Sequence, residues 1–131
     1  MSDGYDTTKA DFAYFKKRVT IWLKWIGLLK WNIHFDCAQI HDGEAETNID
    51  VPGLTATFRL SSHIDGYDCF TKAQIDSAAE HEIWHLLIAK LQFLANERFG
   101  VTPELVEETV EEIVNQLTTL TIRGKKKSAR R

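Results

Sequence analysis

The stretch that decides the fold covers residues 78–94 and reads AAEHEIWHLLIAKLQFL. It is the centre of a longer segment in which apolar residues recur at helical spacing on almost every side. A helix that is apolar on most of its faces is usually a buried one. We therefore expect one long buried helix from about Thr71 to Phe99, with Gly100 placed to end it.

Three patterned segments precede this helix. Residues 8–29 carry apolar side chains at helical spacing with lysines between them, which predicts an amphipathic helix. Residues 31–37 and residues 54–60 alternate between apolar and polar side chains, as half-buried strands do. The polar segment between His41 and Gly53 has turn signals near both ends and can hold a further strand whose limits are not defined. Residues 61–68 are expected to form a loop.

A last helix follows the long one. Thr102 is a good N-cap and Pro103 suits the first helical turn, so the helix is expected to run to about Leu120. The order is then helix, small sheet of about three strands, helix, helix, which is an α+β arrangement. The length of 131 residues fits one domain, here residues 1–122. The basic residues 123–131 are expected to form a disordered tail.

The composition limits the classes of partner and the cellular location that are expected for the protein. With 44% hydrophobic and 27% charged residues, the chain resembles an ordinary soluble domain. Its beginning lacks a secretory signal and no apolar stretch is long enough to span a bilayer, so no membrane partner is expected. The net charge of −3 gives no general reason to expect nucleic-acid binding. Cys37 and Cys69 are the only two cysteines, and two thiols without a secretory signal favour a reducing, cytoplasmic location over a disulfide framework. Neither has the CxxC partner that is typical of a zinc-binding cysteine.

The long helix contains the pattern HEIWH at residues 81–85. Because His81 and His85 are four residues apart, they project from one side of the helix at the separation that suits two imidazole ligands of one zinc ion. Glu82 points about a quarter turn aside and can reach a zinc-bound water without binding the metal. It would act as the general base for attack on a carbonyl. The competing interpretation is a pair of hydrogen-bonded core histidines, with Glu82 reaching solvent.

A tetrahedral catalytic zinc site needs a third protein ligand. No histidine follows position 85, so a carboxylate of the last helix is expected to supply it. At about 100° per residue, Glu107 lies nearest to the centre of the apolar stripe of that helix and Glu111 somewhat further round. Glu108 and Glu112 lie on the far side. The geometry of the helix alone therefore leaves Glu107 and Glu111 as candidates for the third ligand.

Two segments carry a resemblance to a known family. HEIWHLL at residues 81–87 and EEIVNQL at residues 111–117 resemble the corresponding motifs of small gluzincin zinc metallopeptidases, including those encoded by bacteriophages. The resemblance implies a zincin-like fold, a Zn²⁺ cofactor, and Glu111 as third ligand, because the residues three and four positions after it match the family pattern. Glu107, and after it Glu108, are the alternative candidates for the third ligand. For a phage protein, the location would be the host cytoplasm.

The expected activity is zinc-dependent hydrolysis of a peptide or amide bond in a polypeptide substrate. Such enzymes pair an extended substrate with an edge strand above the active-site helix, and residues 54–60 are the expected strand. His63 and Tyr67 are candidate donors to the oxyanion. One alternative is a zinc-binding protein without catalytic activity that binds or inhibits a host or viral protein. Another is a zinc-free helical interaction domain.

Overall fold

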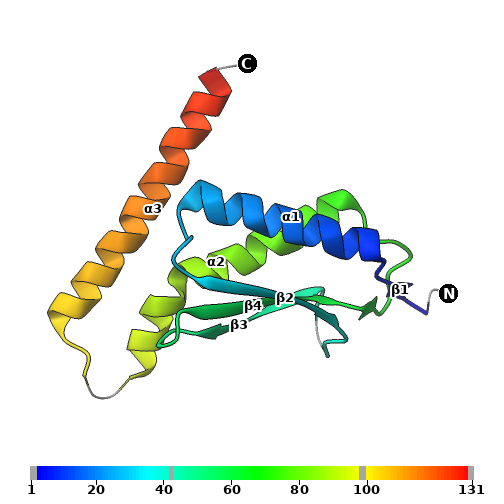
Figure 1. Ribbon diagram of the computed structural model, residues 1–131, viewed down its shortest axis with the longest axis horizontal. Coiled ribbons are helices and arrows are strands. Elements are labelled where there is room, and N and C mark those ends of the chain that lie inside the picture. Colours follow the sequence, from blue (N-terminus) through cyan, green and yellow to red (C-terminus); the bar gives the residue numbers. More distant parts are fainter. Residues whose placement is uncertain (1–2, 42, 98–99, 130–131) are drawn as a thin grey trace.

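The computed structural model describes residues 3–41, 43–97 and 100–129, with side chains described as far as Leu120. Over these residues the fold is α+β, as predicted, with three helices and two small sheets (Figure 1). In chain order the elements are β1 (Tyr5–Asp6), α1 (Lys9–Ile26), β2 (Asn32–Ala38), β3 (Ala45–Asp50), β4 (Thr55–Ser61), β5 (His63–Ile64), α2 (Lys72–Asn96) and α3 (Pro103–Ala129).

The main sheet has three strands in the order β2-β4-β3, with β2 parallel and β3 antiparallel to β4. Phe58 of β4 lies between Phe35 of β2 and Thr47 of β3 in this register. Helices α1 and α2 both lie on one face of this sheet (Figure 1). Alternate residues of β4 point into the core beneath the helices and are fully buried, namely Ala56, Phe58 and Leu60. The prediction of about three strands is confirmed, including the strand between His41 and Gly53.

Helix α1 begins and ends where its local sequence requires. The hydroxyl of Thr8 accepts a hydrogen bond from the Asp11 amide at 3.1 Å, and the Asp11 carboxylate accepts one from the Thr8 amide at 3.0 Å. This reciprocal capping stabilises the first turn. Gly27, with φ of +87°, adopts the left-handed conformation that ends the helix earlier than the predicted Leu29. The predicted apolar face is buried through Phe15, Val19, Leu23 and Ile26.

Helix α2 is less enclosed than its sequence predicts. Its buried residues include Ile75, Ile83 and Leu86, which pack in the core. One lengthwise strip is exposed, however, and consists of Ser77, His81, His85, Ile88 and Gln92. The sheet and α1 cover only part of the circumference of the helix, so this strip faces solvent. The helix also ends at Asn96 rather than at Phe99, which lies outside the described residues.

Helix α3 is longer than predicted. The hydroxyl of Thr102 accepts a hydrogen bond from the Leu105 amide at 3.1 Å, which caps the first turn as expected. The helix then continues to Ala129 instead of ending near Leu120, so the predicted tail of residues 123–131 is helical as far as residue 129. Residues 130–131 lie outside the described residues. Lysines near a helix C-terminus interact favourably with the helix dipole, and no proline interrupts this segment. No helix within the described residues is both long and apolar enough to cross a membrane.

The segment predicted as a loop, residues 61–68, contains a short strand that the sequence did not indicate. His63–Ile64 forms β5 and pairs antiparallel with β1, Tyr5–Asp6, in a separate two-stranded sheet. Two residues are too few to show an alternating pattern. The pairing joins the start of the chain to the loop that leads into α2.

Candidate functional site

The two histidines of the HEIWH pattern lie side by side on the exposed strip of α2. Their Nε2 atoms are 3.2 Å apart, and the ring centroids are 4.9 Å apart with the planes at 76°. Both side chains are exposed. The interpretation of His81 and His85 as buried core histidines is therefore wrong.

The spacing of the two Nε2 atoms fits a common metal ion. Ligand nitrogens about 2.0–2.1 Å from a tetrahedral zinc lie roughly 3.3 Å from one another. The distance between His81 Nε2 and His85 Nε2, 3.2 Å, is close to that value. The same distance also suits a direct hydrogen bond when one of the rings carries the proton. The helix thus holds two imidazole nitrogens where both can bind the same metal ion.

Glu82 is held in a different environment from its histidine neighbours. It is only 5% exposed, and its Oε1 accepts a hydrogen bond from the Thr47 hydroxyl at 2.7 Å. Thr47 lies on β3, on the side of the strand that faces α2. A contact 35 residues apart in the chain therefore fixes the carboxylate beside His81. Glu82 does not reach into open solvent.

Two adjoining hollows meet at His81 and Glu82. One, of about 410 Å³, follows β3 and is lined by Ala45, Glu46, Thr47, Ile49, His81, Glu82, His85 and Gln92. The other, of about 660 Å³, lies toward the loop before α2 and shares Ala45, His81 and Glu82 with the first. Together they form a groove that runs past the candidate site.

The strand that borders this groove is not the predicted one. Residues 54–60 were expected to form the edge, but β4 is hydrogen-bonded to β2 on one side and to β3 on the other. The edge strand beside the histidines is β3. The inward side chains of β3 are Ala45, Thr47 and Ile49. Because Thr47 is polar, the alternation of apolar and polar residues along this strand was too weak to identify from the sequence.

The structure does not bring the predicted third ligand to the histidine pair. Glu111 is exposed on α3 and lines a shallow hollow on that helix together with Glu107 and Glu108. Within the described residues, no group of three or more His, Cys, Asp or Glu side chains is placed to hold a metal ion. His81, Glu82 and His85 are thus brought together without a carboxylate from α3.

The rotation of α3 about its axis explains this arrangement. The side facing the body carries Thr109, which is fully buried, and Ile113, which packs against the core. Glu112, expected on the far side, instead forms ion pairs with Lys90 at 3.2 Å and Lys30 at 3.5 Å. Part of the expected inward stripe is exposed, namely Val110, Val114 and Leu117.

Another carboxylate lies closer to the histidines. Glu44 lines the larger hollow together with His81 and Glu82. Its Oε1 accepts a hydrogen bond from the Tyr67 hydroxyl, and this bond raises the pKa of Tyr67. Glu46 also lines the groove but is bound to Arg59 at 2.5 Å on the opposite side of the sheet. Sequence reasoning missed Glu44 because it lies in a segment without a clear pattern.

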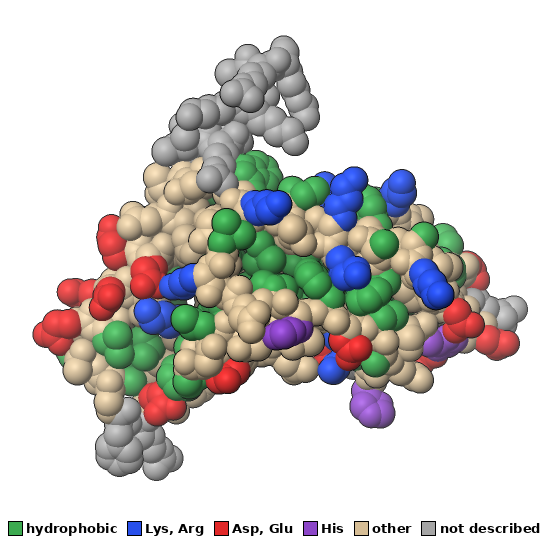
Figure 2. Space-filling model, in the orientation of Figure 1, with side chains coloured by type: hydrophobic (Ala, Val, Ile, Leu, Met, Phe, Trp, Pro, Cys, Tyr) green, Lys and Arg blue, Asp and Glu red, His purple; other side chains and the backbone are tan. Residues whose placement is uncertain are grey.

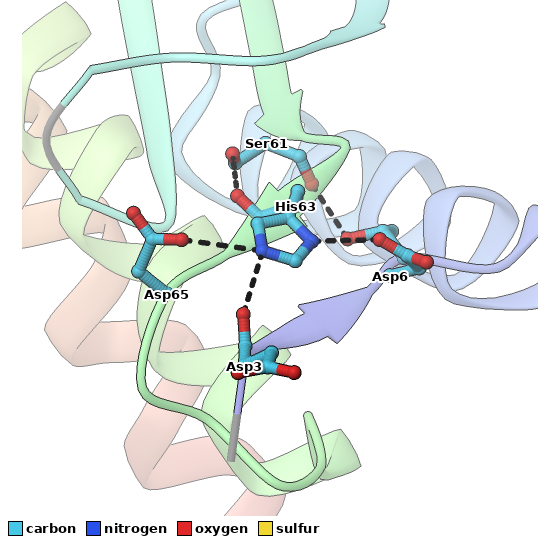
Figure 3. Close-up of polar contacts among 6 residues, drawn as sticks. Asp3, Asp6, Ser61, His63 and Asp65 are labelled. Atoms are coloured by element: carbon cyan, nitrogen blue, oxygen red, sulfur yellow. Dashed lines mark hydrogen bonds and ion pairs between the residues drawn. The ribbon is translucent and has the colours of Figure 1, made fainter.

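His63, one of the two candidate oxyanion donors, is occupied by other contacts (Figure 3). Its Nδ1 lies 2.7 Å from the Asp6 carboxylate. Its Nε2 lies 3.2 Å from both the Asp3 carbonyl and the Asp65 carboxylate. These contacts connect β5 to β1. His63 therefore ties the start of the chain to the rim of the groove.

This histidine predicts a pH dependence of the β1–β5 pairing. The hydrogen bond to Asp6 raises the pKa of His63 above its ordinary 6.5, and the contacts with Asp3 and Asp65 act in the same direction. A raised pKa in the folded state means that the contribution to stability is full below pH 6.5 and is lost as the pH rises through the folded-state pKa. We expect the amide of Thr7, bonded to the Ser62 carbonyl at 2.9 Å, to exchange with solvent relatively faster at alkaline pH.

Hydrogen exchange followed by mass spectrometry, corrected for the intrinsic pH dependence of exchange, measures this effect. The His63→Gln variant should show weaker protection of β1 at pH 5.5 and no pH-dependent change around the histidine pKa. Equal pH dependence in parent and variant would show that another group is responsible.

Comparison with protein-family models, with curated proteins and with solved structures gave no match for this chain. The motif HEIWH and the geometry around it are therefore the features that indicate a function.

Proposed function

We propose that this chain is a zinc-dependent hydrolase of peptide or amide bonds, with His81 and His85 as metal ligands and Glu82 as general base. The observation that carries the proposal is the 3.2 Å separation of the two Nε2 atoms beside a buried, oriented carboxylate. Burying a carboxylate is unfavourable, and the one hydrogen bond from the neutral Thr47 hydroxyl offsets only part of that cost. The position of Glu82 next to two exposed imidazoles therefore favours a chemical role.

Each residue of the site has a distinct task in this proposal. Zinc, when bound, lowers the pKa of water and polarises a carbonyl group. Glu82 accepts the proton of the attacking water and later returns it to the leaving amine. Thr47 is a positioning residue, because its hydroxyl holds one carboxylate oxygen and leaves the other available.

The proposed substrate is a polypeptide in extended conformation. An edge strand presents unpaired backbone N–H and C=O groups, which can bind a further strand. Strand β3 is such an edge, and its inward residues line the groove next to His81 and His85. A peptide paired with β3 would pass over the histidines, which brings a scissile bond toward Glu82.

The third ligand stays a prediction. The resemblance to gluzincins favours Glu111, whereas position in the groove favours Glu44. For Glu111 to bind the same ion, α3 would have to move or rotate relative to α2 on metal binding. Glu44 would have to exchange its hydrogen bond from Tyr67 for the metal.

Metal analysis and calorimetry test the proposal. We expect about one zinc per purified chain, lost in the variant His81→Gln/His85→Gln. The matched control is His34→Gln, because His34 is also exposed but lies on β2 away from the groove. Zinc at a concentration about 100 times its Kd should stabilise the parent by roughly 2.7 kcal/mol and leave the double variant unchanged.

The same titration distinguishes the possible third ligands. Glu111→Ala, Glu44→Ala and Glu112→Ala should be compared, and only loss of the true ligand should weaken zinc affinity strongly. Absence of zinc from the parent, with no stabilisation when zinc is added, would overturn the metal site and favour the zinc-free interaction domain.

A further inference from the structure

A cavity of about 180 Å³ lies between α3 and the rest of the molecule. Its wall comes from four parts of the chain, which are the loop between α1 and β2, the turn between β3 and β4, and the helices α2 and α3. Figure 2 shows a hollow between α3 and the body of the molecule, with blue Lys or Arg side chains beside it. Among the described residues, the cavity shares none with the groove at His81 and His85, so it is a separate site.

The interior of the cavity is apolar. Each of the four parts contributes apolar side chains to it, namely Leu28, Trp31, Val51, Leu86, Leu87 and Ile113. Thr109 is fully buried there, and its hydroxyl donates a hydrogen bond to the Leu105 carbonyl at 2.9 Å, so its donor is already used. An enclosed apolar cavity of roughly 150 Å³ can hold one benzene molecule. This cavity therefore has room for a single ring or a short alkyl chain.

The charged side chains at the cavity carry an excess of positive charge. Among the described residues that line it, Lys30, Lys90 and Glu112 are charged. The two carboxylate oxygens of Glu112 lie 3.2 Å from Lys90 Nζ and 3.5 Å from Lys30 Nζ. Two positive charges and one negative charge leave a net charge of +1. Because an ammonium group has three donors, both lysines can bind a second carboxylate without releasing Glu112.

Leu54 lines the same cavity from a strained backbone position. Its φ is +52°, and it is the one non-glycine residue with a positive φ in the described part of the chain. Its amide donates to the Val51 carbonyl at 3.2 Å, and its carbonyl accepts from the Asn32 amide at 2.8 Å, so the turn holds it there. Glycine would adopt this conformation without strain. The presence of leucine instead favours a role for its side chain at the cavity.

We propose that this cavity binds a small carboxylic acid with an apolar body, of the size of benzoate or hexanoate. The apolar body occupies the interior, where its removal from water contributes to affinity. The carboxylate pairs with Lys30 and Lys90, and such charge-assisted hydrogen bonds are stronger than neutral ones. A drug-sized ligand needs roughly 300 Å³ or more, so the volume limits the ligand to a small molecule.

Titration of the ¹⁵N-labelled full chain with sodium benzoate, followed by NMR, tests the proposal. Trp31 lines the cavity, whereas Trp22 lies beside Trp25 and Trp84 at centroid distances of 5.2 Å and 5.6 Å. The indole N–H signal of Trp31, assigned with the variant Trp31→Phe, should shift while the other three stay in place. The expected Kd is roughly 10⁻⁴–10⁻³ M, which is within the ligand-efficiency limits for about nine non-hydrogen atoms.

Two charge variants should change the affinity in opposite directions. Lys90→Gln should weaken benzoate binding by about 10-fold or more, because it removes a charge-assisted hydrogen bond. Glu112→Gln should strengthen binding, because it removes a like charge and leaves both lysines available to the ligand. A general disturbance of α3 would not produce this gain. The matched control is Lys17→Gln, which removes an exposed charge from α1 and should bind like the parent.

Further ligands and one further variant complete the test. Leu54→Gly should weaken binding, because it removes an apolar side chain from the cavity wall. Tighter binding of benzoate than of hexanoate would assign an aromatic body to the ligand, and the reverse an aliphatic one. The proposal would be overturned if neither acid shifted the Trp31 signal, or if acetate shifted it at the same concentration as benzoate. Equal affinity for benzyl alcohol and benzoate, with Lys90→Gln unchanged, would also overturn it.

Discussion

Glu82→Gln is expected to lower the rate of peptide hydrolysis by about 10²–10⁴-fold, while the fold and zinc binding are retained. The side chain is 5% exposed and accepts a hydrogen bond from Thr47 at 2.7 Å. Glutamine has nearly the same shape, and its amide oxygen can accept the same hydrogen bond. It cannot take up the proton of an attacking water. The loss should therefore appear in catalysis and not in structure.

A mixed peptide library with mass-spectrometric detection is the starting assay, because the substrate is not specified by the site. Glu80→Gln is a matched control: it removes the same charge two residues earlier on α2, where the side chain points to a different side. Equal cleavage by the parent and Glu82→Gln would assign the activity to another site or another protein. Zinc binding by both proteins without any cleavage would favour the non-catalytic binding module.

Phe58→Ala should destabilise the protein by about 3–5 kcal/mol, the largest effect on stability that we expect from a single substitution. Phe58 is fully buried on the central strand β4, and its ring centroid lies 6.0 Å from that of Phe35. Removing the ring leaves a cavity between the sheet and the helices, which the surrounding backbone cannot close. Because α2 packs on this sheet, loss of the core also removes the support for the histidine pair.

Thermal or urea denaturation followed by circular dichroism measures this effect. For a chain of this size, a loss of this magnitude corresponds to a decrease in Tm of roughly 10–20 °C. Leu29→Ala is the control, since Leu29 is 67% exposed and its truncation should change stability by no more than about 0.5 kcal/mol. Similar losses in both variants would show that the core is not organised around β4.

The parts of the fold that follow a local rule were predictable. The alternation in residues 54–60 identified β4, and its apolar members are the buried ones. The spacing of apolar residues located α1 and α2 to within a few residues, and the capping pair Thr102-Pro103 located the start of α3. The strand β3 could be anticipated but not delimited, and β1 and β5 were not anticipated. These strands are defined by hydrogen bonds to distant partners, such as Tyr5 with Ile64, which leave no repeat in the sequence.

The candidate site could be predicted only in part, because some of its features depend on neighbouring residues and others on distant contacts. The four-residue spacing of His81 and His85 on a helix brings their side chains together in any tertiary context. Glu82 follows automatically as their neighbour. The exposure of the histidines, by contrast, depends on how much of α2 the sheet and α1 cover. The contact between Glu82 and Thr47 depends on β3 lying at the sheet edge.

The sequence by itself thus determined the helices, the central strand and the pairing of the two histidines, because each depends on residues within a few positions of one another. Only the tertiary structure decided which strand borders the groove, which side of α3 faces the body, and where the carboxylates lie relative to His81. These features depend on how whole elements pack, and the free energy of that packing is spread over many distant contacts that no short stretch of sequence contains.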